Sequence, residues 1–502
     1  MTFCQNPLSL SDAISILSGA EGSANNTEPN LNANNMNKLI KFRLIIMNIL
    51  QWAVWGAYLT SMGSYLSKVG LGDSIGHFYA LQGIVSIFMP TLMGIVADKW
   101  IPAQRLLGLC HGIAGAGMLG AGFYGMMAGN EVSFGILFSL YAIGAAFYMP
   151  TIALSNSVAF KILETNGYDT VKAFPPIRVF GTIGFILAML FVNFVSINGV
   201  QFQNSHNQFI TSGVIGITML AYCFTLPNCP CVKDAGGKQT LAERFGLNAF
   251  RLFKDKQMAI FFIFSMLLGV ALQITNGYAN PYISHFKAVP EFASSWGAQN
   301  ANALISISQI SETLGILLIP FAMKLFGIKR VMLIAMLGWV LRFGLFGVGD
   351  PGSGVWMLIL SMVVYGVAFD FFNISGALYT NMRTSEKMQN SAQGLFMLMT
   401  NGIGATVGMV SAQKVIDMFI KTEAFVLEKA SGAYMAATEF CKTHDLLPEK
   451  LKTLNPNEYT VDYFMVGDWP QVWYIFAGYA LVVAILFIFL FKTPKNIEEK
   501  VA

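Results

Sequence analysis

The sequence predicts an all-α polytopic membrane protein with twelve transmembrane helices arranged in two halves of six. Hydrophobic residues make up 55% of the 502 residues and charged residues only 12%, whereas soluble domains carry about 25% charged residues. The apolar residues gather in stretches of about 20, the length that crosses a bilayer as a helix. In addition, the fourth stretch resembles the tenth, which indicates an internal duplication.

Twelve apolar stretches follow one another along the chain. The predicted spans are 40–66, 75–97, 104–128, 132–156, 170–195, 208–227, 258–283, 298–323, 330–348, 355–381, 389–417 and 470–492. Residues 1–35 are polar, rich in Asn and unlike a signal peptide. We interpret them as a disordered extension, or as the product of a misassigned start upstream of Met36.

The distribution of basic residues predicts the topology. The connections on the N-terminal side of the membrane are rich in Lys and Arg, whereas the short loops of the other face carry Lys68 and Lys287. The positive-inside rule therefore places both termini in the cytoplasm. The net charge of +4 is spread over short loops, so we expect the lipid bilayer, and no nucleic acid, as a partner.

The two halves share a sequence frame. SLYAIGAAFYMPTIALSN, from Ser139, aligns without a gap to SMVVYGVAFDFFNISGAL, from Ser361. In this alignment Asp370 stands where the first half has Tyr148. Repeated halves are the plan of many secondary transporters.

The duplication also suggests domain boundaries. We expect an N-terminal half at 36–227, a cytoplasmic linker at 228–257 and a C-terminal half at 258–502. The C-terminal half includes a long, charged outer segment at 420–468, for which the sequence indicates no function.

Four charged residues lie deep inside predicted spans: Arg178, Glu312, Arg342 and Asp370. Each should face a cavity or a partner, because a charge near the bilayer centre costs roughly 2.5–3.5 kcal/mol. Two positive and two negative charges permit full pairing, and the helical phase leaves open whether Arg342 pairs with Asp370 or with Glu312. Ion pairs that only fix helix contacts are the alternative. No nucleophile–base or metal-ligand set lies on these spans, so neither an enzyme nor a cofactor is indicated.

Polar and aromatic residues accompany these charges at helical spacing. The sets are Arg178, Thr182 and Phe185; Gln273 and Asn276; Gln309 and Glu312; and Tyr365, Phe369 and Asp370. They suit an uncharged, hydroxyl-rich solute with a flat ring, because amides and carboxylates bind hydroxyl groups and aromatic faces stack on rings. A carboxylate there can also exchange a proton as its surroundings change. Asp370, and after it Glu312, are the predicted proton carriers.

The connection between the second and third spans carries Gly94, Asp98, Lys99 and Arg105. This pattern resembles the loop signature of the major facilitator superfamily. We expect Asp98, Lys99 and Arg105 to form a gate whose contacts break when the inner side opens. The alternative is that these charged residues only fix the orientation of the loop at the membrane surface.

Several segments together resemble bacterial nucleoside:H⁺ symporters, a family of that superfamily. They are FMPTLMGIVADKW, FPPIRVFGTIGF, MAIFFIFSMLLG, LQITN, SISQISETL, YGVAFDFFNISG and LMTNGIG, and the likeness runs from about residue 40 to the end. The resemblance implies the major facilitator fold and proton-coupled uptake of purine and pyrimidine nucleosides, such as uridine and adenosine, across the bacterial inner membrane. We expect the protein to act as a monomer, although the sequence leaves the oligomeric state open. It also implies that the residues of the four polar and aromatic sets line the nucleoside site.

Two alternatives remain open at this point. A sugar or glycoside:H⁺ symporter of the same fold would use similar polar and aromatic residues. A nucleoside sensor would bind its ligand without net flux.

Overall fold

The computed structural model describes residues 38–230, 247–384, 389–455 and 457–493. The extension expected at 1–35 and most of the expected linker lie outside these residues. Within them, ten helices are long and apolar enough to cross a membrane. One of the ten, α12 (Ala301–Val348), contains two spans, because Gly327 turns the chain inside it with a φ of 73°. A further apolar helix, α8 (Asn207–Cys223), has 17 residues, so the described chain is consistent with the twelve predicted spans.

The first half of the chain contains the shorter and more broken elements. They are α2 (Lys38–Gly56), α3 (Met62–Lys68), η2 (Gly72–Ser74), α4 (Ile75–Lys99), α5 (Ala103–Ala128), α6 (Phe134–Thr165), α7 (Thr170–Phe194), the hairpin β1 (Ser196–Ile197) and β2 (Val200–Gln201), η3 (Phe202–Asn204) and α8. The predicted span 40–66 is built from two helices, since a turn at 57–61 separates α2 from α3.

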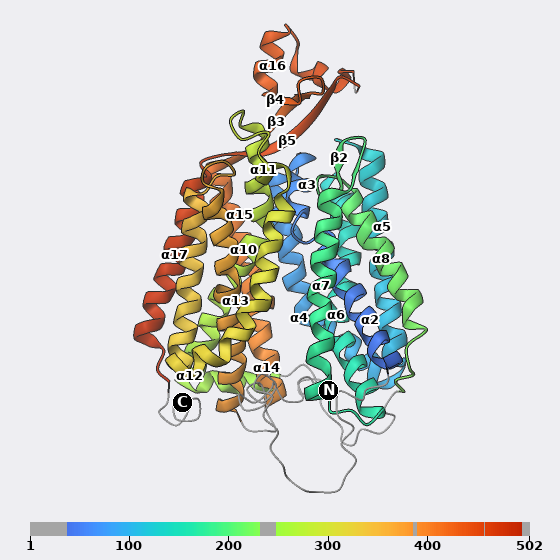
Figure 1. Cartoon of the computed structure of the whole chain (residues 1–502), viewed down its shortest axis with the longest axis vertical. Helices are drawn as coiled ribbons and strands as arrows, with labels where there is room; N and C mark the ends of the chain where they lie inside the picture. Colours follow the sequence, from blue (N-terminus) through green and yellow to red (C-terminus); the bar gives the residue numbers. More distant parts are fainter. Residues whose placement is uncertain (1–37, 231–246, 385–388, 456, 494–502) are drawn as a thin grey trace, which may run out of the picture.

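The second half begins with a short 3₁₀ helix and continues with long helices. The elements are η4 (Leu247–Lys254), α10 (Lys256–His285), η5 (Phe286–Ala288), α11 (Trp296–Gln299), α12, α13 (Val355–Arg383), α14 (Gln389–Met397), the π-helical η6 (Leu398–Gly404), α15 (Ala405–Phe419) and α17 (Trp469–Leu490). Figure 1 shows α2–α8 on one side of the molecule and α10–α15 with α17 on the other, with α2 beginning and α17 ending at the same end. The exact boundaries of the two halves stay a prediction.

Residues 420–467 fold into a small outer domain at the opposite end. Its antiparallel sheet has the order β4-β3-β5 and is built from β3 (Ile420–Glu428), β4 (Ala433–Ala436) and β5 (Tyr459–Gly467), with α16 (Ala437–Thr443) and η7 (Pro448–Thr453) beside it. Val426 and Phe440 belong to a small core of its own. β3 follows α15 without a gap and β5 ends two residues before α17 begins, so both connections of this domain lead to the C-terminal half (Figure 1).

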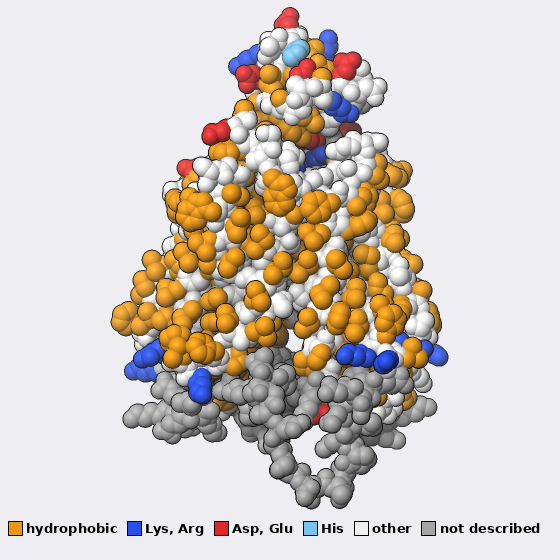
Figure 2. All heavy atoms as spheres, in the orientation of Figure 1, with side chains coloured by type: hydrophobic (Ala, Val, Ile, Leu, Met, Phe, Trp, Pro, Cys, Tyr) orange, Lys and Arg blue, Asp and Glu red, His pale blue; other side chains and the backbone are white. Residues whose placement is uncertain are grey.

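Polar contacts join the two halves at the end of the molecule that carries the outer domain, which we call the strand-bearing end. Ser64 donates a hydrogen bond of 2.5 Å to Asn280, and Thr60 donates one of 2.9 Å to Asn302. Figure 2 shows a gap between the two halves towards the opposite end. The structure is therefore closed at the end that the basic residues predict to be external.

Gly63 allows this closure. A Cβ added there would overlap the carbonyl oxygen of Gly277 and lie 2.8 Å from Cγ of Pro281, so only glycine lets α3 approach α10 this closely. We expect Gly63→Leu to destabilise the closed external end by the typical overpacking cost of about 1–3 kcal/mol. Labelling of a cysteine at position 280 by a membrane-impermeant maleimide, in a Cys441→Ser background, should then be at least about fivefold faster.

The matched control is Gly135→Leu on α6, where an added Cβ meets nothing within 4 Å. Equal labelling rates for Gly63→Leu and Gly135→Leu would contradict the role assigned to Gly63.

Candidate functional site

The predicted site residues lie on α7, α10, α12 and α13, and Arg178 on α7 is the contribution of the first half to the charged group. Its guanidinium carbon lies 4.0 Å from the ring centroid of Trp52 on α2, a cation–π contact. Glycines let α7 and α2 pack this closely: a Cβ added at Gly184 would overlap the backbone of Ile49. Arg178 also interacts electrostatically with Glu312 on α12, without a direct ion pair among the described residues, so opposite charges of the two halves lie near each other.

Close packing of α12 on α13 brings the acidic residues together. A Cβ added at Gly366 would overlap the backbone of Ser311, and one at Gly315 would lie 2.9 Å from the backbone of Gly366. Glu312, beside Ser311, therefore lies near α13, where it interacts electrostatically with Asp370 and Tyr365. Two carboxyl groups and one guanidinium thus share one region.

Asp370 is the most unusual member of this group. Its side chain is 3% exposed, and its Oδ2 has no hydrogen-bond partner among the residues that the structure describes. Buried polar atoms are nearly always paired, because an unpaired one loses the hydrogen bonds of water without replacement. This oxygen is therefore available to a proton or to the polar group of a bound solute.

Aromatic rings flank the acidic residues. The rings of Tyr365 and Phe369 are stacked, with centroids 5.8 Å apart and planes inclined by 13°. Trp339 meets Tyr365 edge to face, and Gln309 lies within hydrogen-bonding reach of the Tyr365 hydroxyl. The arrangement offers flat apolar faces next to amide and carboxyl groups.

Arg342 pairs with neither of the two predicted partners. Its Nη1 donates to the carbonyl oxygen of Ser361 at 2.7 Å, and its guanidinium carbon lies 4.7 Å from the ring centroid of Tyr365. It forms no ion pair with a described residue. Both expectations, a pair with Asp370 and a pair with Glu312, are therefore wrong, because a backbone carbonyl and an aromatic face occupy the guanidinium instead.

The remaining predicted residues lie on the same helices without joining the charged group directly. On α10, the Asn276 amide donates to Gln273 at 3.4 Å. On α7, Thr182 is half-buried, and Phe185 meets Trp55 edge to face, with centroids 6.5 Å apart. Within the described part of the chain, none of these four residues forms a hydrogen bond with Arg178, Glu312 or Asp370.

Sequence reasoning missed three aromatic residues near Arg178. Trp52 and Trp55 on α2 form a tilted pair, and the indole Nε1 of each is buried without a partner among the described residues. Tyr148 on α6 packs against Trp55 and interacts with Arg178. The available signal was LQWAVWG, in which two tryptophans three residues apart interrupt an apolar span.

The predicted gate remains untested. The side chains of Asp98 and Lys99 lie outside the described residues, and Arg105 is exposed in the first turn of α5.

Comparisons with known proteins agree on one family. The family model described as "Nucleoside H+ symporter" matches residues 37–441. The chain is 42% identical to xanthosine permease of Escherichia coli K12 over 467 residues, covering 92% of this chain and 99% of the relative. It is 40% identical to nucleoside permease NupG of the same organism, covering 90% and 96% of the two chains.

Solved structures give the same result. The crystal structure of a mutant of nucleoside transporter NupG matches with a TM-score of 0.76 and 40% identity, covering 90% of this chain and all of that one. The inward-open xylose transporter XylE of E. coli, at 13% identity and a TM-score of 0.55, shares the fold. The chain is a transporter that belongs to the nucleoside:H⁺ symporter family of the major facilitator superfamily.

Proposed function

We propose that this protein takes up purine and pyrimidine nucleosides together with protons, by alternating access across the bacterial inner membrane. The observation that carries the proposal is Asp370, a buried carboxyl group with an unpartnered oxygen beside Glu312 and a stacked aromatic pair. The family and its permease relatives support a nucleoside as the solute.

The geometry suggests a division of tasks among the site residues. Phe369 and Tyr365 offer the flat faces on which a base stacks. Gln273, Asn276, Gln309 and Glu312 supply amide and carboxylate groups for ribose hydroxyls or base edges. Arg178, with Thr182 and Phe185 on the same helix, closes the site from the other half.

The proton step rests on the two carboxyl groups. When Asp370 is protonated, it carries no charge and can donate a hydrogen bond to the solute; when it is ionised, it needs a cation or a strong donor nearby. Arg178 is the cation that the opposite half can bring closer or take away as the halves rock. Asp370, with Glu312 as second carrier, would thus load a proton on one side and release it on the other.

Several finer expectations belong to the same proposal. The protein would act as a monomer with both termini in the cytoplasm, accept uridine and adenosine, and need only protons as the coupling ion. Asp98, Lys99 and Arg105 would form the inner gate.

The test is uptake of radiolabelled uridine and adenosine into proteoliposomes, with and without an inward proton gradient. We expect accumulation that follows the gradient and collapses when a protonophore is added. Binding without accumulation would contradict transport and favour a sensor, and uptake inhibited by sugars but not by nucleosides would favour a glycoside symporter.

A further inference from the structure

A small polar cavity lies where the two halves and the outer domain meet. Its volume is about 30 Å³, room for one small ion or for one or two water molecules. Lys68 on α3 and Asn204 on η3 line it from the first half, Ser284 and Lys287 line it from the second, and Tyr434 and Asp462 line it from the outer domain. Any occupant of this cavity therefore touches all three parts of the protein.

The carboxylate in the cavity wall, Asp462, already has a cation and a hydroxyl beside it, although its Oδ1 accepts no hydrogen bond from a described residue. Asp462 is buried, its Oδ1 lies 3.3 Å from the Lys68 ammonium, and its Oδ2 accepts a hydrogen bond of 2.6 Å from Tyr434. Burial and the neighbouring carboxylate raise the pKa of Tyr434, so this hydroxyl keeps its proton and remains a donor.

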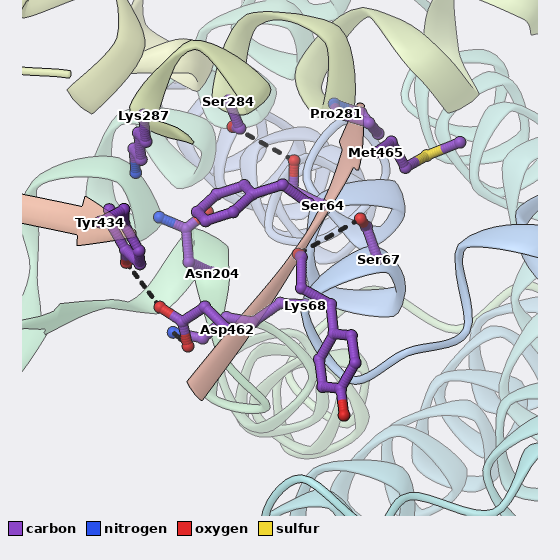
Figure 3. Close-up of a pocket in the computed structure, with 12 residues that line it drawn as sticks. Ser64, Ser67, Lys68, Asn204, Pro281, Ser284, Lys287, Tyr434, Asp462 and Met465 are labelled. Atoms are coloured by element: carbon purple, nitrogen blue, oxygen red, sulfur yellow. Dashed lines mark hydrogen bonds and ion pairs between the residues drawn. The ribbon is translucent and has the colours of Figure 1, made fainter. Parts of the chain in front are cut away.

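Lys287 is the unpaired member of the cluster. Its side chain is only 7% exposed, yet its ammonium forms no hydrogen bond or ion pair with a described residue. It interacts electrostatically with Lys68 and Asp462. Figure 3 shows this ammonium pointing towards Tyr434 and Asn204. A largely buried ammonium that lies beside a second ammonium favours a negative charge in its surroundings.

The charges around the cavity therefore do not balance. Lys68 and Lys287 bring two positive charges and Asp462 brings one negative charge. Nearby His206 adds none at neutral pH, because burial and Lys68 lower the pKa of its imidazole. The Asn204 amide adds a hydrogen-bond donor beside this excess charge, since only one of its two N–H groups is used, in a bond of 3.2 Å to Gln201.

We propose that this cavity is a binding site for a small inorganic anion of chloride size, held chiefly by Lys287 and Lys68. A volume of about 30 Å³ fits an anion of chloride size better than a larger one. Because its ligands come from both halves and from the outer domain, the bound anion stabilises the state that is closed at the external end. The site is separate from the solute site and does not depend on which solute is carried.

Binding to the folded protein raises its melting temperature, so stability in different salts tests the site without any transport assay. The purified full-length protein is melted in detergent in sodium chloride, bromide or gluconate, and in sodium sulfate at equal ionic strength. We expect a Tm higher by about 2 °C or more in chloride and bromide than in gluconate or sulfate. Equal Tm values in chloride and gluconate would overturn the proposal.

Two variants separate the site from general salt effects. Lys287→Gln should abolish the difference between chloride and gluconate, whereas Lys421→Gln, which removes an exposed lysine of the outer domain, should retain it. A chloride effect that survives in Lys287→Gln would overturn the assignment.

A direct measurement covers the case in which Lys287→Gln does not fold. Crystals of the unmodified protein soaked in bromide should show an anomalous peak between Lys68 and Lys287. Bromide peaks elsewhere on the protein, with none in this cavity, would overturn the proposal.

Discussion

Asp370→Asn is expected to abolish proton-driven accumulation of nucleosides while leaving exchange intact. The amide fills the same space and can still bind the solute, but it cannot pick up or release a proton. In proteoliposomes with an inward proton gradient, the ratio of internal to external nucleoside should fall to unity. Exchange of external for preloaded labelled nucleoside should continue, and its rate should no longer depend on pH.

Asp73→Asn is the control for this substitution, because Asp73 lies exposed on η2 at the strand-bearing end. It should accumulate nucleosides as the parent protein does. If Asp370→Asn still accumulates nucleosides to the parent ratio, Asp370 is not the proton carrier, and Glu312 becomes the next residue to test.

The second large effect concerns the charge pair between the halves. Removing either partner leaves the other charge without the opposite charge with which it interacts. Because the two side chains form no direct ion pair in this state, we expect a loss of about 1.4 kcal/mol, so that Arg178→Gln and Glu312→Gln each lower kcat/KM for uptake by roughly tenfold. The double variant should lose far less than the product of the two single losses.

Initial rates of uptake over a range of nucleoside concentrations measure these effects as a double-mutant cycle. Glu291→Gln, which removes an exposed glutamate outside the site, should change kcat/KM little. Additive losses in the double variant would show that Arg178 and Glu312 act independently, and the role of Arg178 in closing the site would fall.

The charged residues of the candidate site could be picked out from the sequence because charges inside apolar spans are costly and therefore rare. Arg178, Glu312 and Asp370 stand out from their neighbours for this reason, and the structure brings all three into one region. Trp52 and Trp55 carry no such signal, because an aromatic residue in a span is usually part of the packing between helices.

Pairing between helices was harder to predict. Helical phase shows which residues share a face of one helix, but the neighbour of that face depends on packing. Arg342 illustrates this limit, since its guanidinium contacts the Ser361 carbonyl and the Tyr365 ring, and a backbone carbonyl leaves no mark in the sequence. The outer domain escaped prediction for a related reason: its short strands lie among polar turns and give a weak periodic signal.

The attachment of the outer domain has a mechanical consequence. Because β3 and β5 continue directly from α15 and into α17, we expect the domain to move with the C-terminal half, so that a small rotation of this half displaces the tip of the domain further. A fluorophore attached to the exposed Lys442 of α16 would report this displacement during transport. The label would lie far from the candidate solute site and would not disturb it.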